Sequence, residues 1–137
     1  MDDEPQTRFL EALIAKHGAV AGTVHLMADG ILKLAASVNI PPKVIELTRE
    51  IPRGKGMAGL AWERVTPVQT CNLKDDDSGD VRPGAKAVDA KAALAMPVTD
   101  DDGEVRAVVG LAFMFERDLE DDEVAAMTAD ASAVPRP

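Results

Sequence analysis

The sequence predicts a single α+β domain, residues 1–137, built on an antiparallel sheet. Two hairpin signals carry this prediction: one lies in residues 19–38, where Asp29-Gly30 joins two strand-like runs, and the other lies in residues 91–116. Asp-Gly between such runs is a strong hairpin signal, and strands joined by hairpins pair antiparallel. Helical patterns at both ends of the chain predict that terminal helices cover one face of the sheet.

The first elements follow from apolar spacing and from the residues at their ends. Apolar residues recur at helical spacing over residues 4–17, and Asp3 and Gly18 suit the two ends, so we expect an amphipathic helix there. Residues 19–27 and 31–38 alternate as strands and form the first hairpin.

The middle of the chain reads as short elements around a group of glycines. Residues 41–51 begin with prolines, which suit a first helical turn, and predict a short helix. Glycines mark residues 54–59, after which we expect a helix at 57–65 and a short strand at 67–71. Residues 72–90 are rich in Asp, Gly and Pro and predict a long surface loop.

The last part of the chain reads as a second hairpin and a closing helix. Strands at 91–98 and 104–116 flank an acidic turn, and Asp118 is expected to cap the helix that follows. A proline stops that helix, and residues 134–137 are expected to fray, which leaves a domain core of about residues 5–133. One face of the helix carries Val124, Met127 and Ala131.

The composition argues against several classes of partner. The net charge of −9 disfavours nucleic acids and membrane surfaces, because both are bound largely through basic residues. No apolar run reaches the ~20 residues of a membrane span. The acidic N-terminus does not resemble a signal peptide, so we expect a cytoplasmic protein. Cys71 is the only cysteine and cannot form an internal disulfide.

Gly54, Gly56 and Gly59 satisfy the pattern G-x-G-x-x-G, which also marks dinucleotide-binding turns. Such a turn needs a strand before it and a helix after it that crosses back to a parallel strand. Here the preceding residues are helix-like and interrupted by Pro52, and only seven residues separate Gly59 from Pro67, where the next strand begins. The glycines therefore predict a tight turn into a short helix that lies close to a sheet.

Two stretches together resemble the GAF domain over about residues 5–133. They are IPRGKGMAGLAWERVTPV (51–68), which is followed by an acidic loop, and AALAMPVTDDDGEVRAVVGLAF (92–113), which is followed by an acidic helix. The resemblance is to stand-alone bacterial GAF proteins and implies an antiparallel sheet with terminal helices on one face. It also implies a helix-loop insertion, residues 53–90, that covers the other face and encloses a small molecule.

One class of GAF enzyme, the free methionine-R-sulfoxide reductases, is a further alternative. These enzymes attack the sulfoxide with a thiolate and resolve the product through further cysteines, so turnover needs at least two thiols. This chain has only Cys71, and Met57 stands where those enzymes tend to carry a thiol-bearing loop. We therefore expect no enzymatic activity, and we expect Cys71 to be a small buried apolar residue rather than a redox sensor.

The residues that other GAF domains use for bilin attachment or cyclic-nucleotide binding are missing from this sequence. Photoreceptor GAF domains attach a bilin through a cysteine beside a histidine, but Cys71 has no histidine neighbour, and no N-K-x-D-E-type stretch of the cyclic-nucleotide-binding domains is present. The acidic run 75–80 is out of EF-hand register. His17 and His25 lie on different elements. We expect no cofactor and no metal.

The candidate pocket residues gather around the glycine turn. Backbone amides at the start of the helix after it can hold an anion or a carboxylate. Trp62, one turn further on, either roofs the pocket or fills the core. Arg53, Lys55 and Arg82 are charge partners for an anion or else ordinary surface charges. The candidate ligand-binding residues are Gly56, Met57, Ala58, Trp62, Cys71, Arg82 and Met96.

The resulting hypothesis is a non-enzymatic sensory or regulatory module that binds a small molecule between the sheet and residues 53–90. The alternative is a protein-interaction or dimerisation module whose pocket is filled and vestigial. In either case a separate signalling protein is expected to receive the output. The terminal helices each carry an apolar stripe, so we also expect a homodimer through residues 4–17 and 119–133.

Overall fold

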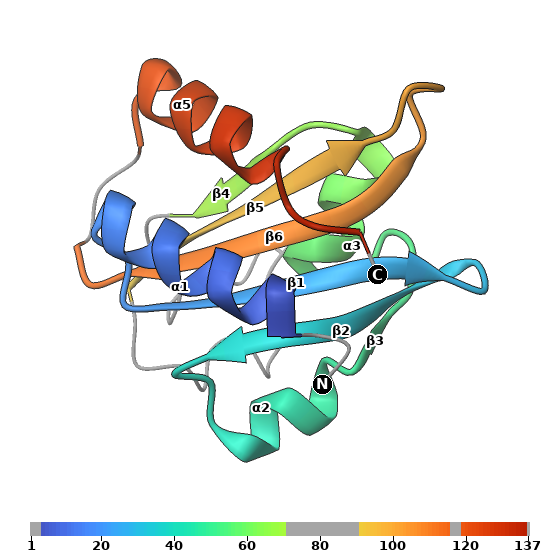
Figure 1. The fold of residues 1–137 in the computed structure, drawn as a ribbon, viewed down its shortest axis with the longest axis horizontal. Helices are drawn as coiled ribbons and strands as arrows, with labels where there is room; N and C mark the ends of the chain where they lie inside the picture. The colour runs from blue at the N-terminus through green and yellow to red at the C-terminus, as the bar shows by residue number, and fades with distance from the viewer. Residues whose placement is uncertain (1–3, 71–90, 116–118, 137) are drawn as a thin grey trace.

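The computed structural model describes residues 4–70, 91–115 and 119–136. It is an α+β fold around an antiparallel sheet, as predicted, and the sheet has six strands in the order β3-β2-β1-β6-β5-β4 (Figure 1). No helix within these ranges is long and apolar enough to cross a membrane. The elements are α1 (Glu4–His17), β1 (Ala21–Ala28), β2 (Ile31–Val38), α2 (Pro42–Leu47), β3 (Glu50–Ile51), α3 (Gly56–Arg64), β4 (Val68–Thr70), β5 (Ala92–Thr99), β6 (Val105–Phe113) and α5 (Asp121–Ala131).

The two predicted hairpins form the centre of the sheet. Asp29 and Gly30 turn the chain between β1 and β2 with φ angles of 56° and 79°, the left-handed conformations that a tight hairpin turn needs. β5 and β6 pair from Ala92 opposite Phe113 to Thr99 opposite Val105. β1 then pairs with β6, which joins the hairpins side by side.

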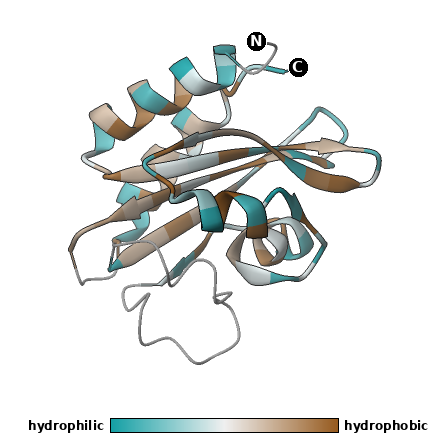
Figure 2. Ribbon diagram, turned by 90° about the horizontal axis from the view of Figure 1, so that it is seen from below, coloured by the Kyte–Doolittle hydropathy of each residue, from teal (hydrophilic) through white to brown (hydrophobic). Residues whose placement is uncertain are grey.

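The sheet has a different layer of helices on each face. α1 and α5 cover one face, and α2 and α3 lie over the other (Figure 2). Successive residues of a strand point to opposite faces, so Val24 and Leu26 of β1 pack with Leu10 and Met127 of the terminal helices. The apolar stripes of α1 and α5 are therefore buried within the same chain.

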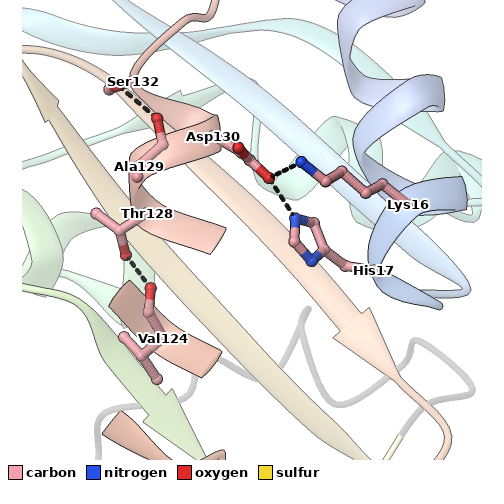
Figure 3. Close-up of polar contacts among 7 residues, drawn as sticks. All are labelled: Lys16, His17, Val124, Thr128, Ala129, Asp130 and Ser132. Carbon is pink, nitrogen blue, oxygen red and sulfur yellow. Dashed lines mark hydrogen bonds and ion pairs between the residues drawn. The ribbon is translucent and has the colours of Figure 1, made fainter. Parts of the chain in front are cut away.

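An ionic contact holds the two terminal helices together (Figure 3). Asp130 Oδ2 of α5 lies 2.8 Å from Lys16 Nζ and 2.8 Å from His17 Nε2 at the end of α1. The hydrogen bonds from Lys16 and then His17 lower the pKa of the Asp130 carboxyl. The contact joins the end of α5 to the end of α1 on the surface of the domain.

The end of the chain is packed rather than frayed. Val134 is 2% exposed, and Gln6 Nε2 donates hydrogen bonds to the carbonyl oxygens of Pro135 and Arg136 at 3.0 and 3.1 Å. The Arg106 guanidinium donates to the Val134 carbonyl at 2.8 Å. The prediction of a frayed end is therefore wrong for residues 134, 135 and 136, because side chains on α1 and β6 bind their backbone.

Residues 41–51 do not form one helix as predicted. α2 ends at Leu47, and the chain then turns so that Ile51 pairs with Leu32 at the edge of the sheet. Ile51 is 3% exposed. Full burial of such a side chain stabilises by about 1.5–3 kcal/mol, whereas helix propensities differ by at most about 0.7 kcal/mol per ordinary residue. The packing of Ile51 thus outweighs the local preference for helix.

The start of α5 also differs from the prediction. The N-cap is Glu120, whose backbone N–H donates to Glu123 Oε1 at 2.9 Å in a capping box. Gln69 fixes the preceding residue, because its Oε1 accepts from the Leu119 N–H at 2.8 Å. Asp118, the predicted cap, lies outside the described residues, as does the predicted loop at 72–90.

Candidate functional site

The glycine turn before α3 uses its three glycines for two different physical reasons. Gly54 and Gly56 adopt φ angles of +80° and +68°, which glycine reaches without strain. Gly59 is needed for close approach, because a Cβ atom there would lie 2.5 Å from the Pro52 carbonyl oxygen. A hydrogen bond from Gly54 N to Gly59 O at 2.9 Å closes the turn. The turn therefore fixes where α3 begins.

The first turn of α3 has no side-chain cap. Its N-cap residue is Lys55, whose ammonium group cannot accept a hydrogen bond from the helix. The first helical hydrogen bond runs from Gly59 N to Lys55 O at 3.2 Å. The amides of Gly56, Met57 and Ala58 therefore have no helical partner, and no bond to them occurs among the described residues. A helix start of this kind favours a negatively charged or acceptor group.

Two adjoining hollows lie between the sheet and the helices on this face. The first, about 130 Å³, lies over β1, β5 and β6, and the second, about 140 Å³, lies between β1, α2 and the start of α3. Four residues line both hollows, so the two are neighbours along one wall. These shared residues are Thr23, Ile40, Met57 and Ala58.

The first hollow exists because the strand residues beneath it are small. Gly110 of β6 lies opposite both Thr23 of β1 and Ala95 of β5. A Cβ atom on Gly110 would lie 2.9 Å from Thr23 Oγ1. Ala93 and Ala112 extend the same floor. Larger side chains at these positions would fill the space between the sheet and Met57.

His25 places a buried polar group at the second hollow. Its side chain lines that hollow and is 3% exposed. Nε2 lies 2.7 Å from the Thr48 carbonyl oxygen, and because a carbonyl only accepts, Nε2 must carry the hydrogen. Burial lowers the pKa of His25, an effect partly opposed by the hydrogen bond to Thr48. The ring is therefore neutral at pH 7, and Nδ1 is a buried acceptor without a partner in the described part of the chain.

The pKa of His25 predicts that stability falls in mild acid. The unfolded chain takes up this proton near pH 6.5 and the folded chain only at lower pH, so the unfolded state binds more protons as the pH drops below 6.5. The free energy of unfolding should then decrease by up to about 1.4 kcal/mol per pH unit, and this group should add no dependence above pH 7.5. Urea unfolding from pH 5 to 7.5 measures the slope. His25→Gln should flatten it, and an equal slope in both proteins would contradict the assignment.

The structure brings part of the predicted site together. Gly56, Met57 and Ala58 line the hollows, and Met57 and Ala58 line both. Their role in ligand binding stays a prediction. Cys71 and Arg82 lie outside the described residues.

Two other predicted site residues lie elsewhere. Trp62 is half-buried against a cluster that contains Ile51 and Val68 and lines neither hollow, so it fills core rather than roofing the pocket. Met96 is 0% exposed and packs with Leu94 in the core beneath the terminal helices. The alternation of β5 points Met96 away from the hollows, so its prediction as a ligand residue is wrong.

Thr23 and His25 are the site residues that the sequence analysis missed. They stand two residues apart on β1 and alternate with Val24 and Leu26. That spacing places both polar residues on the face opposite the terminal helices. The signal was present in the sequence, but its meaning depends on knowing which face of the sheet carries α1.

The sequence profile of the GAF domain matches residues 3–134. The chain belongs to the GAF domain family. The match spans nearly the whole chain and agrees with the antiparallel sheet, which confirms the family resemblance seen in the sequence. A search of curated protein sequences found no significant match.

Solved structures that share this fold include other GAF domains and an enzyme. The type II free methionine-R-sulfoxide reductase from Thermoplasma acidophilum has a TM-score of 0.74 at 17% identity, covering 91% of this chain and 83% of that one. The GAF domain/HD domain protein from Geobacter sulfurreducens has a TM-score of 0.73 at 17% identity, covering 96% and 88%. The nlh2 GAF domain of A. aeolicus, in an inactive state, has a TM-score of 0.69 at 17% identity, covering 98% and 80%. Likeness at this identity establishes the fold alone.

Proposed function

We propose that this GAF domain is a non-enzymatic regulatory module that binds a small molecule in the two hollows between the sheet and α2–α3. The observation that carries the proposal is an apolar space bordered by unused polar groups, namely the first amides of α3, with the buried side chain of His25 in the same lining. Buried polar groups are normally paired. An apolar cavity of about 150 Å³ is large enough for benzene, and each hollow is close to that size.

Binding rather than reduction is proposed on chemical grounds. A reductase that forms a disulfide during turnover needs a second thiol, and Cys71 is the only cysteine of the sequence. The similarity to a methionine-R-sulfoxide reductase is therefore one of fold, while the single cysteine here favours reversible binding. A separate signalling protein as the receiver of the output, and a cytoplasmic location, stay predictions.

The second candidate is an interaction module. Leu10 and Leu13 of α1 and Met127 of α5 are buried in the core of the same chain. A homodimer through residues 4–17 and 119–133 would therefore use the outer faces of these helices rather than their apolar stripes. The homodimer stays a prediction, and the unused polar groups at the hollows favour the ligand-binding candidate.

A cavity-filling variant tests the proposed site. Ala93→Leu adds three carbons to the floor of the first hollow, and Ala126→Leu adds the same three on the exposed face of α5. In NMR titrations with a library of small metabolites, we expect saturable shifts of the amides of residues 56–58 in the wild type and in Ala126→Leu, but none in Ala93→Leu. The filled variant should be as stable as the wild type or more stable, by about 0.5–2 kcal/mol.

Two outcomes would overturn the proposal. One is a library compound that shifts the amide signals of residues 56–58 as strongly in Ala93→Leu as in the wild type, because the site would then lie elsewhere. The other is the absence of any saturable shift in the wild type, which would favour the interaction module.

A further inference from the structure

The floor of the first hollow is a level area of the sheet. Two rows of directly opposite residues cross β1, β6 and β5 there, and the side chains of both rows share one face. Neighbouring strands lie about 4.8 Å apart and alternate residues of one strand about 6.8 Å apart, so the floor measures roughly 10 Å by 7 Å. No side chain on it is longer than that of threonine. The rows are Ala21, Ala112 and Ala93, and Thr23, Gly110 and Ala95.

Gly110 keeps the centre of this floor free of any projection. It lies between Thr23 and Ala95 in its row. A Cβ atom on Gly110 would lie only 2.9 Å from Thr23 Oγ1, which also shows that the Thr23 side chain points to this face of the sheet. The middle of the floor is therefore bare backbone.

Met57 supplies the border of the space above the floor. Its side chain packs against the cluster that contains Ala21 and Ala112, and it lines both hollows. A thioether makes favourable contacts with aromatic rings, often at the ring edge. No charged side chain of the described ranges lines the first hollow. The hollow therefore combines a level apolar surface with a polarisable sulfur at its border.

We propose that the ligand enters the first hollow with a flat, uncharged aromatic ring that lies on this floor beside Met57. The inference rests on the proposed function and names the chemical class of the ligand. A planar ring brings all of its atoms against a level surface, whereas a puckered or branched group of the same size touches it with few, and dispersion attraction grows with the number of contacts. The volume of about 130 Å³ suits one ring, since a cavity of about 150 Å³ binds benzene.

Two matched probes, benzyl alcohol and cyclohexylmethanol, test the shape of the site in NMR titrations of the full-length wild-type protein. The probes share their heavy-atom skeleton and hydroxyl group, but only benzyl alcohol has a flat ring. The saturated ring has the larger apolar surface, so burial of area alone would favour cyclohexylmethanol. We expect benzyl alcohol to bind at least about threefold more tightly, with shifts at residues 56–58 that persist in Ala126→Leu and vanish in Ala93→Leu. Equal or tighter binding of cyclohexylmethanol would overturn the inference.

Met57→Leu tests the contact at the border of the hollow. The substitution removes the sulfur at nearly constant side-chain volume, a change that cores usually tolerate. Benzyl alcohol should lose about threefold in affinity, within the range of sulfur–aromatic contacts, and cyclohexylmethanol should lose little. A general loosening of the site would weaken both probes alike, so an equal loss for the two would overturn the inference.

The library of the cavity-filling experiment separates failure of the ligand class from failure of the function. Failure of both probes, with other library compounds still excluded by Ala93→Leu, would overturn the aromatic ring and leave the proposed function standing. Failure of the probes and of the library together would overturn both.

Discussion

Gly59→Ala is expected to destabilise the domain by about 3 kcal/mol, near the upper end of what overpacking usually costs. The added Cβ would lie 2.5 Å from the Pro52 carbonyl oxygen and 3.2 Å from Gly54 N. Both are backbone atoms of the turn, so no side chain can rotate to relieve the contact. The turn must move away from α3. The first residues of α3, which line the hollows, then move as well. Urea unfolding measures the loss of stability.

Gly103→Ala is the matched control for this variant. Gly103 has a φ angle of +81°, and a Cβ atom there would meet nothing within 4 Å. Its substitution therefore measures the backbone cost alone, about 1 kcal/mol, and should leave ligand binding unchanged. Gly56→Val is expected between the two, at about 1–3 kcal/mol, because Gly56 has a φ angle of +68°. If Gly59→Ala is as stable as Gly103→Ala, the close approach of the Pro52 carbonyl oxygen is not the reason that residue 59 is a glycine.

Met96→Ala is expected to cost about 3 kcal/mol and to leave the ligand site intact. Met96 is fully buried between the sheet and the terminal helices, and truncating a buried Met to Ala typically costs 2–5 kcal/mol. Met57 is the matched residue on the other face, where it is partly buried and lines both hollows.

Met57→Ala should therefore destabilise the domain much less than Met96→Ala but weaken ligand binding. Chemical denaturation and ligand titration of the two variants separate these effects. A Met96→Ala protein that keeps its stability and loses ligand binding would show that Met96 belongs to the pocket and not to the core.

Local chemistry explains why the hairpins and the glycine turn could be predicted from the sequence. Asp29 and Gly30 adopt left-handed conformations that few other residues tolerate, so the turn can be recognised without knowing the rest of the fold. Gly54 and Gly56 have the same property. The resemblance to the GAF family then predicts that the terminal helices cover one face of the sheet and the insertion covers the other.

Packing between distant segments explains most of what could not be predicted. Ile51 joins an edge strand because Leu32 lies opposite it, and nothing within residues 41–51 indicates that partner. The end of the chain is ordered because Gln6 and Arg106 bind its carbonyls. These contacts span 28 or more residues of sequence.

The two faces of the sheet explain the remaining differences at the candidate site. β5 is apolar along almost its whole length, since both of its faces are covered, so its sequence does not show that Met96 points toward the terminal helices. β1 does alternate, with Thr23 and His25 on one face, but alternation alone does not say which face of the sheet borders the hollows. The position of α1 on the face of Val24 and Leu26 identifies the other face as the one that borders the hollows.

A crystal structure of the protein under xenon pressure shows whether the first hollow is open and empty, because xenon enters apolar cavities of that kind. We expect xenon in the first hollow, between Met57 and the floor formed by Ala93 and Gly110, and no xenon there in Ala93→Leu crystals treated in the same way. A hollow filled by side chains of the protein, with no xenon in the wild type, would contradict a ligand-binding pocket and favour an interaction module with a vestigial pocket.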